Sequence, residues 1–206
     1  MNTTEVKYNG EIKSFNDLFK LADKQFRHYE TIEGINDWDE YDFSIDCSQD
    51  QMKFKDMLQI RFVEELTEAS ISIDEEDEHF WEEIGDAMNF FLSAYVMLGV
   101  DLNKFNSPDE FLAHNGNRKK IADLEEFSIA AYPVIEKVGY LCNLLKNRPW
   151  AQSNFLVSMV DFNERLNSLW VKFWSFMGKM NLTSEDVFEM FWKKYQVNLH
   201  RIRTGY

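Results

Sequence analysis

The chain has 206 residues, of which 45% are hydrophobic and 28% are charged, with 18 Phe and 6 Trp but only 8 Gly and 3 Pro. This composition argues against a disordered chain and against a turn-rich all-β fold, and the length suits one all-α domain over residues 1–206. The formal net charge of −14 argues against a nucleic-acid polymer as partner, because no basic stripe is present to hold its phosphates.

The first half of the chain carries three helical patterns. Residues 14–31 have apolar side chains at helical spacing, and Ser14 is a typical N-cap residue. A second pattern covers residues 51–73, and a third covers residues 80–100, which are apolar on nearly every side after Ala87. We therefore expect the second half of the third helix to lie at the centre of a helical bundle.

The second half of the chain begins with weaker signals. Residues 101–154 are predicted to form a helical insertion, in which a helix start at 107–111 precedes a surface loop. Helical periodicity returns over residues 155–178. It appears again after Thr183, which forms a capping box with Asp186 and opens the last helix.

Four carboxylates have the spacing expected of a metal site. Glu65 and Glu68 lie one turn apart beside the apolar stripe of the second helix, and Glu83 and Asp86 repeat this spacing on the third. Two antiparallel helices joined by a short connection would bring the pairs together. Converging carboxylates need a cation because they repel one another, and an all-oxygen set favours Mg²⁺, with Mn²⁺ as the alternative. Such an ion can take water and phosphate oxygens, as hydrolysis of a phosphoanhydride requires.

Two other interpretations of these acids compete with a magnesium site, and only the first stays open. Acid pairs at i, i+3 are common on helix surfaces, and this chain has 36 acidic residues. A ferritin-like di-iron site would need paired Glu-x-x-His motifs. Glu76 with His79 supplies one such pair, and none of the other three histidines follows a Glu at this spacing. One pair does not make a di-iron site.

The last helix carries a polar stripe beside its apolar face. Lys194, Asn198 and Arg201 follow one another at i, i+4 and i+7. Lys and Arg side chains near a metal–carboxylate site would neutralise the phosphate oxygens that the metal does not reach. The alternative is that these cations only complement the negative end of the helix dipole.

Three separated motifs resemble one known family. They are ELTE at 65–68 followed by EIGDAMNF at 83–90, the C-terminal FWKKYQVNLHRIRTGY at 191–206, and a fainter element, QFRHYET at 25–31 with Gly34 and Trp38. In order and spacing they are similar to the metal, terminal and N-terminal motifs of the dimeric dUTPase and phage dCTP pyrophosphatase family. That family belongs to the all-α NTP pyrophosphohydrolases, which also include MazG.

The resemblance implies an activity, a set of site residues and an assembly. A deoxynucleoside triphosphate, dUTP and/or dCTP, would be hydrolysed between its α and β phosphates to the monophosphate and pyrophosphate by a homodimer. The implied roles are Mg²⁺ binding and catalysis by Glu65, Glu68, Glu83 and Asp86, phosphate binding by Lys194, Asn198, Arg201 and Arg203, and base or sugar binding by Gln25, His28, Asn89 and Tyr206.

The departures from the family pattern keep other functions open. His28 and Asn89 stand where the family has Asn and His, and the acidic segment 74–79 replaces a segment rich in Lys and Trp. A MazG-like enzyme acting on a purine nucleotide would share the chemistry. A non-catalytic helical protein that binds nucleotides or another partner would share only the fold.

The sequence also indicates a cellular compartment. Cys47 and Cys142 lie far apart without a CxxC motif, which favours reduced thiols. The N-terminus lacks a signal-peptide core, and the longest apolar run, residues 90–100, is too short to span a bilayer. We expect a cytoplasmic protein with no membrane association, and the ending at Gly205 and Tyr206 resembles phage members of the family and favours a phage origin.

Overall fold

The structure is a computed structural model that describes residues 6–32, 43–145 and 157–205. Within these ranges the chain is all-α and contains no β-strand, which confirms the predicted all-α architecture. The seven α-helices are α1 (Phe15–Ile32), α2 (Ser48–Lys55), α3 (Val63–Ile71), α4 (Asp77–Met97), α5 (Leu124–Leu144), α6 (Met159–Lys179) and α7 (Ser184–Thr204). None of the described helices has the length and apolarity needed to cross a membrane.

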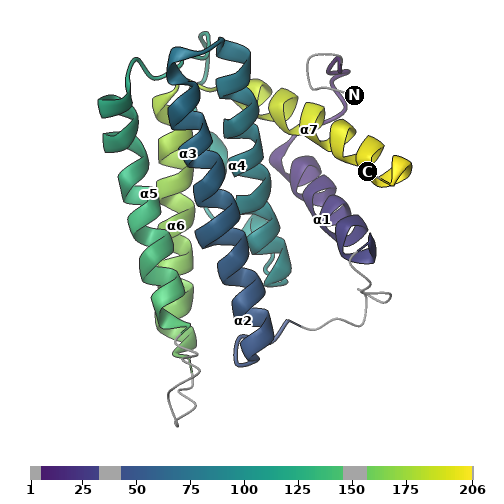
Figure 1. The fold of residues 1–206 in the computed structure, drawn as a ribbon, viewed down its shortest axis with the longest axis vertical. Coiled ribbons are helices and arrows are strands. Elements are labelled where there is room, and N and C mark those ends of the chain that lie inside the picture. Colours follow the sequence, from purple (N-terminus) through teal and green to yellow (C-terminus); the bar gives the residue numbers. More distant parts are fainter. Residues whose placement is uncertain (1–5, 33–42, 146–156, 206) are drawn as a thin grey trace.

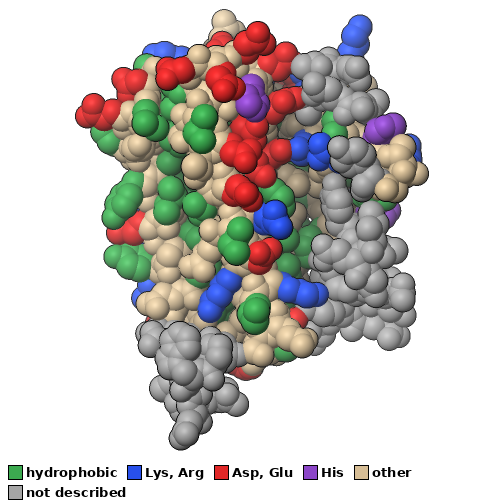
Figure 2. Space-filling model, in the orientation of Figure 1, with side chains coloured by type: hydrophobic (Ala, Val, Ile, Leu, Met, Phe, Trp, Pro, Cys, Tyr) green, Lys and Arg blue, Asp and Glu red, His purple; other side chains and the backbone are tan. Residues whose placement is uncertain are grey.

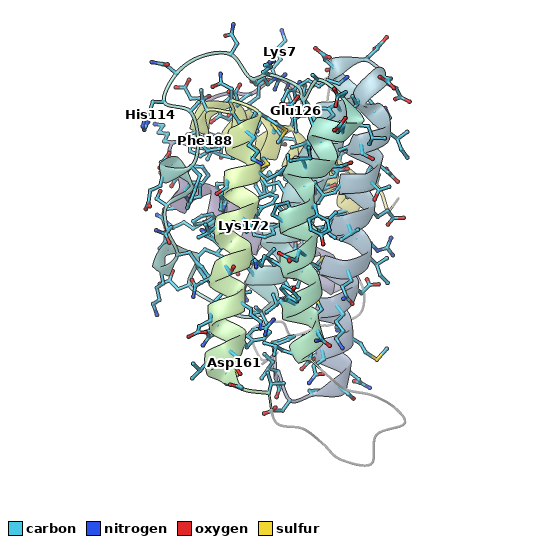
Figure 3. The ribbon with its side chains drawn as sticks, turned by 90° about the vertical axis from the view of Figure 1, so that its left-hand side faces the viewer. Lys7, His114, Glu126, Asp161, Lys172 and Phe188 are labelled. Carbon is cyan, nitrogen blue, oxygen red and sulfur yellow. The ribbon has the colours of Figure 1, made fainter. Side chains whose placement is uncertain are left out.

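The helices form a bundle with two helices packed on one side (Figure 1). Helices α3, α4, α5 and α6 run roughly along the long axis of the molecule, while α1 and α7 cross beside α4. The most extensive packing joins α5 to α6 and α3 to α4. The view of Figure 3 shows α5 and α6 side by side, with Asp161 and Lys172 of α6 on the outer surface.

The helix predicted at 51–73 is longer and less regular than expected. The backbone is helical without a break from Ser48 to Ile71, but Asp56–Phe62 forms a π-helix between α2 and α3. A short 3₁₀ turn then leads into α4, which starts at Asp77 rather than at Phe80. The acidic segment 74–79 is therefore partly connection and partly the first turn of α4, where acidic side chains complement the helix dipole.

The capping residues behave as expected. The backbone N–H of Asp17 donates to Ser14 Oγ at 3.2 Å, and Thr183 forms its capping box with Asp186 before α7. Ser107 also caps a turn, although this turn is a 3₁₀ helix of three residues. The described part of the predicted insertion, residues 101–145, contains α5, which packs against both α6 and α3 and so contributes to the bundle itself.

The core lies around the second half of α4, as the sequence predicts. The ring of Phe91 stacks on that of Phe173 of α6, with 3.9 Å between the ring centroids. Two buried polar groups in this core are satisfied by backbone carbonyls: Tyr95 Oη donates to the carbonyl of Leu166, and Trp170 Nε1 donates to that of Asn106, both at 2.8 Å. The aromatic content of the chain is thus used to fill the space between α4 and α6.

Gly178 marks a close approach between α6 and the chain before α5. A Cβ atom at this position would lie 2.1 Å from the carbonyl oxygen of Phe111, a distance that only a backbone shift could relieve. We expect Gly178→Ala to lower the free energy of unfolding by about 1–3 kcal/mol, the range of overpacked sites, in urea denaturation. Gly139→Ala on α5 is the matched control. Its Cβ would meet nothing within 4 Å, so stability should stay the same or rise by up to about 1 kcal/mol.

Candidate functional site

Three of the four predicted carboxylates converge between α3 and α4. Glu65 of α3 and Glu83 and Asp86 of α4 each offer a carboxylate oxygen, and these oxygens lie within 4.8 Å of one another. Glu83 is buried and the other two are partly buried. They meet because α3 and α4 pack along each other after the short connection that joins them. Figure 2 shows acidic side chains gathered over the upper part of this face.

Glu68 does not join this cluster. Its side chain is exposed on α3, and it lies outside the group of converging oxygens. Three residues along an α-helix correspond to a rotation of about 300°, so Glu68 is displaced by about 60° from Glu65 around the helix axis. Its charge still contributes to the raised pKa of Glu65, as the smallest of five effects.

The cluster is electrostatically unfavourable without a cation. Burial raises the pKa of Glu65 to about 8, and the charge of Asp86 and the hydrogen bond and charge of Glu83 act in the same direction. Burial also raises the pKa of Asp86, although the positive charge of Lys194 opposes this effect. Asp86 Oδ1 is buried and has no hydrogen-bond partner among the described residues. An all-oxygen donor set with an unsatisfied carboxylate oxygen fits a hard divalent cation such as Mg²⁺.

Helix α7 supplies the cationic side of the site. Lys194 Nζ donates to Asp86 Oδ2, and the two side chains are only 16% and 17% exposed. Arg201, two turns further along α7, is close enough to lower the pKa of Asp86 through its charge. Since α7 packs directly on α4, the C-terminal stripe and the carboxylates face each other across this contact.

A cavity of about 280 Å³ joins the carboxylates to the C-terminal stripe. Its lining residues come from the three motifs described in the sequence, or from the helices that carry them, and from the π-helix. The lining residues are Phe26 of α1, Met57 of the π-helix, Glu65 of α3, Asp86, Asn89, Phe90 and Ser93 of α4, and Lys194, Asn198 and Arg201 of α7. The cavity therefore combines acidic, amide, cationic and aromatic side chains.

Two of the residues predicted to contact the base, Asn89 and Gln25, lie at this cavity: Asn89 lines it, and Gln25 contacts Asn89. Gln25 is buried, and its Nε2 donates to Asn89 Oδ1 at 2.5 Å, so that α1 and α4 are linked at the cavity wall. Gln25 Oε1 and His28 Nδ1 are both buried and have no hydrogen-bond partner among the described residues. Of these two unsatisfied atoms of α1, that of Gln25 belongs to the amide that contacts Asn89.

The remaining predicted positions lie elsewhere. Arg203 is exposed in the last turn of α7 and does not line the cavity. Tyr206, Gly34 and Trp38 lie outside the described residues.

His79 is part of the site, whereas its sequence spacing indicated only a pairing with Glu76. Its Nε2 lies 2.8 Å from Glu83 Oε1, and its Nδ1 lies 2.5 Å from Glu75 Oε2. The hydrogen bond to Glu75 is the main reason why the pKa of His79 is raised. The three residues are spaced by four along the chain, and this i, i+4 pattern was the signal that could have revealed the contact.

The π-helix was not anticipated either. Asp56–Phe62 lies one turn before Glu65, and its Met57 lines the cavity. Such wide turns are rare in proteins, but those that occur often lie at functional sites. Apolar periodicity does not reveal them, because one extra residue in a turn hardly changes the pattern over a helix of this length.

Comparisons of the chain with known protein families, with curated proteins and with solved structures found no match.

Proposed function

We propose that this protein hydrolyses a deoxynucleoside triphosphate, dUTP and/or dCTP, to the monophosphate and pyrophosphate with the help of Mg²⁺. The observation that carries the proposal is the shared cavity, which places the carboxylates of α3 and α4 opposite Lys194, Asn198 and Arg201 of α7. These groups lie more than a hundred residues apart in the sequence. If the acids were only a chance pair on the surface, they would not be expected to line a cavity with these cations. The same holds if the cations only complemented the helix dipole.

The carboxylates suit the binding of one hard cation. Glu65, Glu83 and Asp86 would hold Mg²⁺, and Asp86 Oδ1 has no competing partner among the described residues. When bound, the ion supplies charge neutralisation at the phosphates and activation of a water molecule. A carboxylate of the cluster then accepts a proton from the water that attacks the α phosphorus, and the bond from this phosphorus to the bridging oxygen breaks.

The remaining side chains bind and orient the substrate. Lys194 and Arg201 neutralise the charge of the phosphates and of the departing pyrophosphate, and the buried Asn198 donates an amide hydrogen bond. Phe26 and Phe90 offer aromatic surface to the base, while Asn89 offers the amide already held by Gln25. The phosphates and the base of a nucleotide thus both have counterparts in the cavity.

The proposal is tested by following pyrophosphate release from all four deoxynucleoside triphosphates and dUTP. We expect release from dUTP or dCTP with Mg²⁺, none after chelation of the metal, and products that are the monophosphate and pyrophosphate rather than the diphosphate and phosphate. Turnover of a purine nucleotide alone would favour the MazG-like alternative. Binding in calorimetry without turnover of any nucleotide would contradict the proposal and favour a non-catalytic protein.

A further inference from the structure

An ion pair joins Lys194 of α7 to Asp86 of α4 at the carboxylate cluster. We propose that Lys194 acts as an internal cation, which occupies the carboxylate cluster in the metal-free protein and is displaced towards the nucleotide phosphates when a divalent cation binds. This inference rests on the proposed function, because it concerns the same cavity, and it adds a way in which metal and nucleotide enhance each other's binding.

The ammonium group of Lys194 lies at the carboxylate cluster. Lys194 Nζ contacts one oxygen of Asp86, whose carboxylate also contributes to the group of converging oxygens with Glu65 and Glu83. Both members of the pair are more than four-fifths buried. A divalent ion bound to Asp86 would lie within a few ångströms of this ammonium group, and like charges at such a distance repel strongly where water is largely excluded. The ammonium group and the metal ion therefore compete for Asp86.

Lys194 borders two hollows into which its side chain can move. Its side chain has a flexible four-carbon stem and lines the cavity that also contains Asn198 and Arg201, further along the same face of α7. It also borders a smaller hollow with Glu82, whose Oε1 is buried without a hydrogen-bond partner among the described residues. A displaced ammonium group thus finds a carboxylate when the cavity is empty and phosphate oxygens when a nucleotide is bound.

The consequence is a positive coupling between the two ligands. In the metal-free protein the ammonium group is engaged by Asp86 and contributes little to a bound triphosphate. Metal binding releases it, so the nucleotide binds more tightly in the presence of the metal. By linkage the nucleotide also tightens metal binding by the same factor. Removing the ammonium group should therefore strengthen binding of the metal alone and weaken the coupling.

The test is calorimetric titration with Mn²⁺ in the absence of nucleotide. We expect Lys194→Met to bind Mn²⁺ about tenfold more tightly than wild type, because the competing ion pair is absent. Lys193→Met is the matched control. It removes the same charge from the adjacent position, where Lys193 Nζ pairs with Glu189 at 2.7 Å, so it should change the dissociation constant by less than about threefold. Lys194→Gln, which keeps a polar end, should behave like Lys194→Met.

A second titration measures the coupling. A dUTP analogue with an imido bridge between the α and β phosphates is titrated with and without Mn²⁺, and Mn²⁺ should improve its binding less in Lys194→Met than in wild type. If both Lys194 variants bind Mn²⁺ as wild type does, or more weakly, the inference is wrong while the proposed function stands. If wild type binds no Mn²⁺, or if Glu83→Gln binds it equally well, the metal centre of the proposed function fails and the inference fails with it.

Discussion

Glu83→Gln is expected to lower the rate of pyrophosphate release by at least about a thousandfold. Glu83 is the most buried of the three converging carboxylates, and its replacement removes a negative charge from the proposed metal site. A bound metal ion contributes several kcal/mol to stabilising the transition state, and each 1.4 kcal/mol corresponds to about a factor of ten in rate. The measurement is kcat for the preferred nucleotide at saturating Mg²⁺.

Glu64→Gln is the control for this variant. Glu64 is the neighbour of Glu65 on α3, but its side chain is half exposed and pairs weakly with Arg61 at 3.7 Å. We expect kcat within about twofold of wild type, since an exposed ion pair of this kind contributes little to stability or to the site. Circular dichroism should show both variants folded. Activity of Glu83→Gln within tenfold of wild type would mean that the carboxylate cluster is not the catalytic centre.

Raising the pH from 5 to 9 is expected to destabilise the metal-free protein through Glu65. Its pKa is about 8 in the fold, against an ordinary value of 4.5, mainly because the side chain is buried beside Asp86 and Glu83. Between about pH 4.5 and 8 the folded protein therefore keeps a proton that the unfolded chain has lost. The stability is fully present below pH 4.5 and is lost as the pH rises through about 8. Because the Glu65 side chain is only partly buried, solvent screening reduces its effect on stability to roughly 1 kcal/mol. In a chain of this size we expect that effect to lower the melting temperature by about 2–4 °C.

Two comparisons separate Glu65 from the other acids. Glu65→Gln should flatten the fall of the melting temperature between pH 5 and 9, whereas Glu64→Gln should keep the wild-type slope. Metal binding to wild type at pH 7 should release a proton, since Glu65 is then mostly protonated, and calorimetry in two buffers of different ionisation enthalpy measures this release. A slope that Glu65→Gln leaves unchanged would contradict the raised pKa of this group.

Much of the fold can be predicted from local sequence. Ser14 and Thr183 mark helix starts because their side chains satisfy backbone N–H groups, and this interaction depends only on neighbouring residues. The apolar character of the second half of α4 likewise indicates a central position. The packing of α5 on α6 and α3 could not be foreseen, because periodicity shows which face of a helix is buried but not which helix covers it.

The candidate site was predicted in part for the same reason. Helical spacing places Glu83 and Asp86 on one face of α4, yet it could not decide that Glu65 rather than Glu68 would face them. That choice depends on how far α3 is rotated about its own axis when it packs on α4. The contact of Lys194 with Asp86 joins residues 108 positions apart and follows from the crossing of α7 over α4, which no local pattern determines.

The most direct test of the proposed centre is a crystal structure with Mn²⁺ and the imido analogue of dUTP. We expect the anomalous signal of Mn²⁺ within bonding distance of carboxylate oxygens of Glu65, Glu83 and Asp86. The phosphates of the analogue should contact Lys194, Asn198 and Arg201 in the same cavity. A manganese ion bound away from these carboxylates, or an analogue bound in another cavity, would contradict the proposed function.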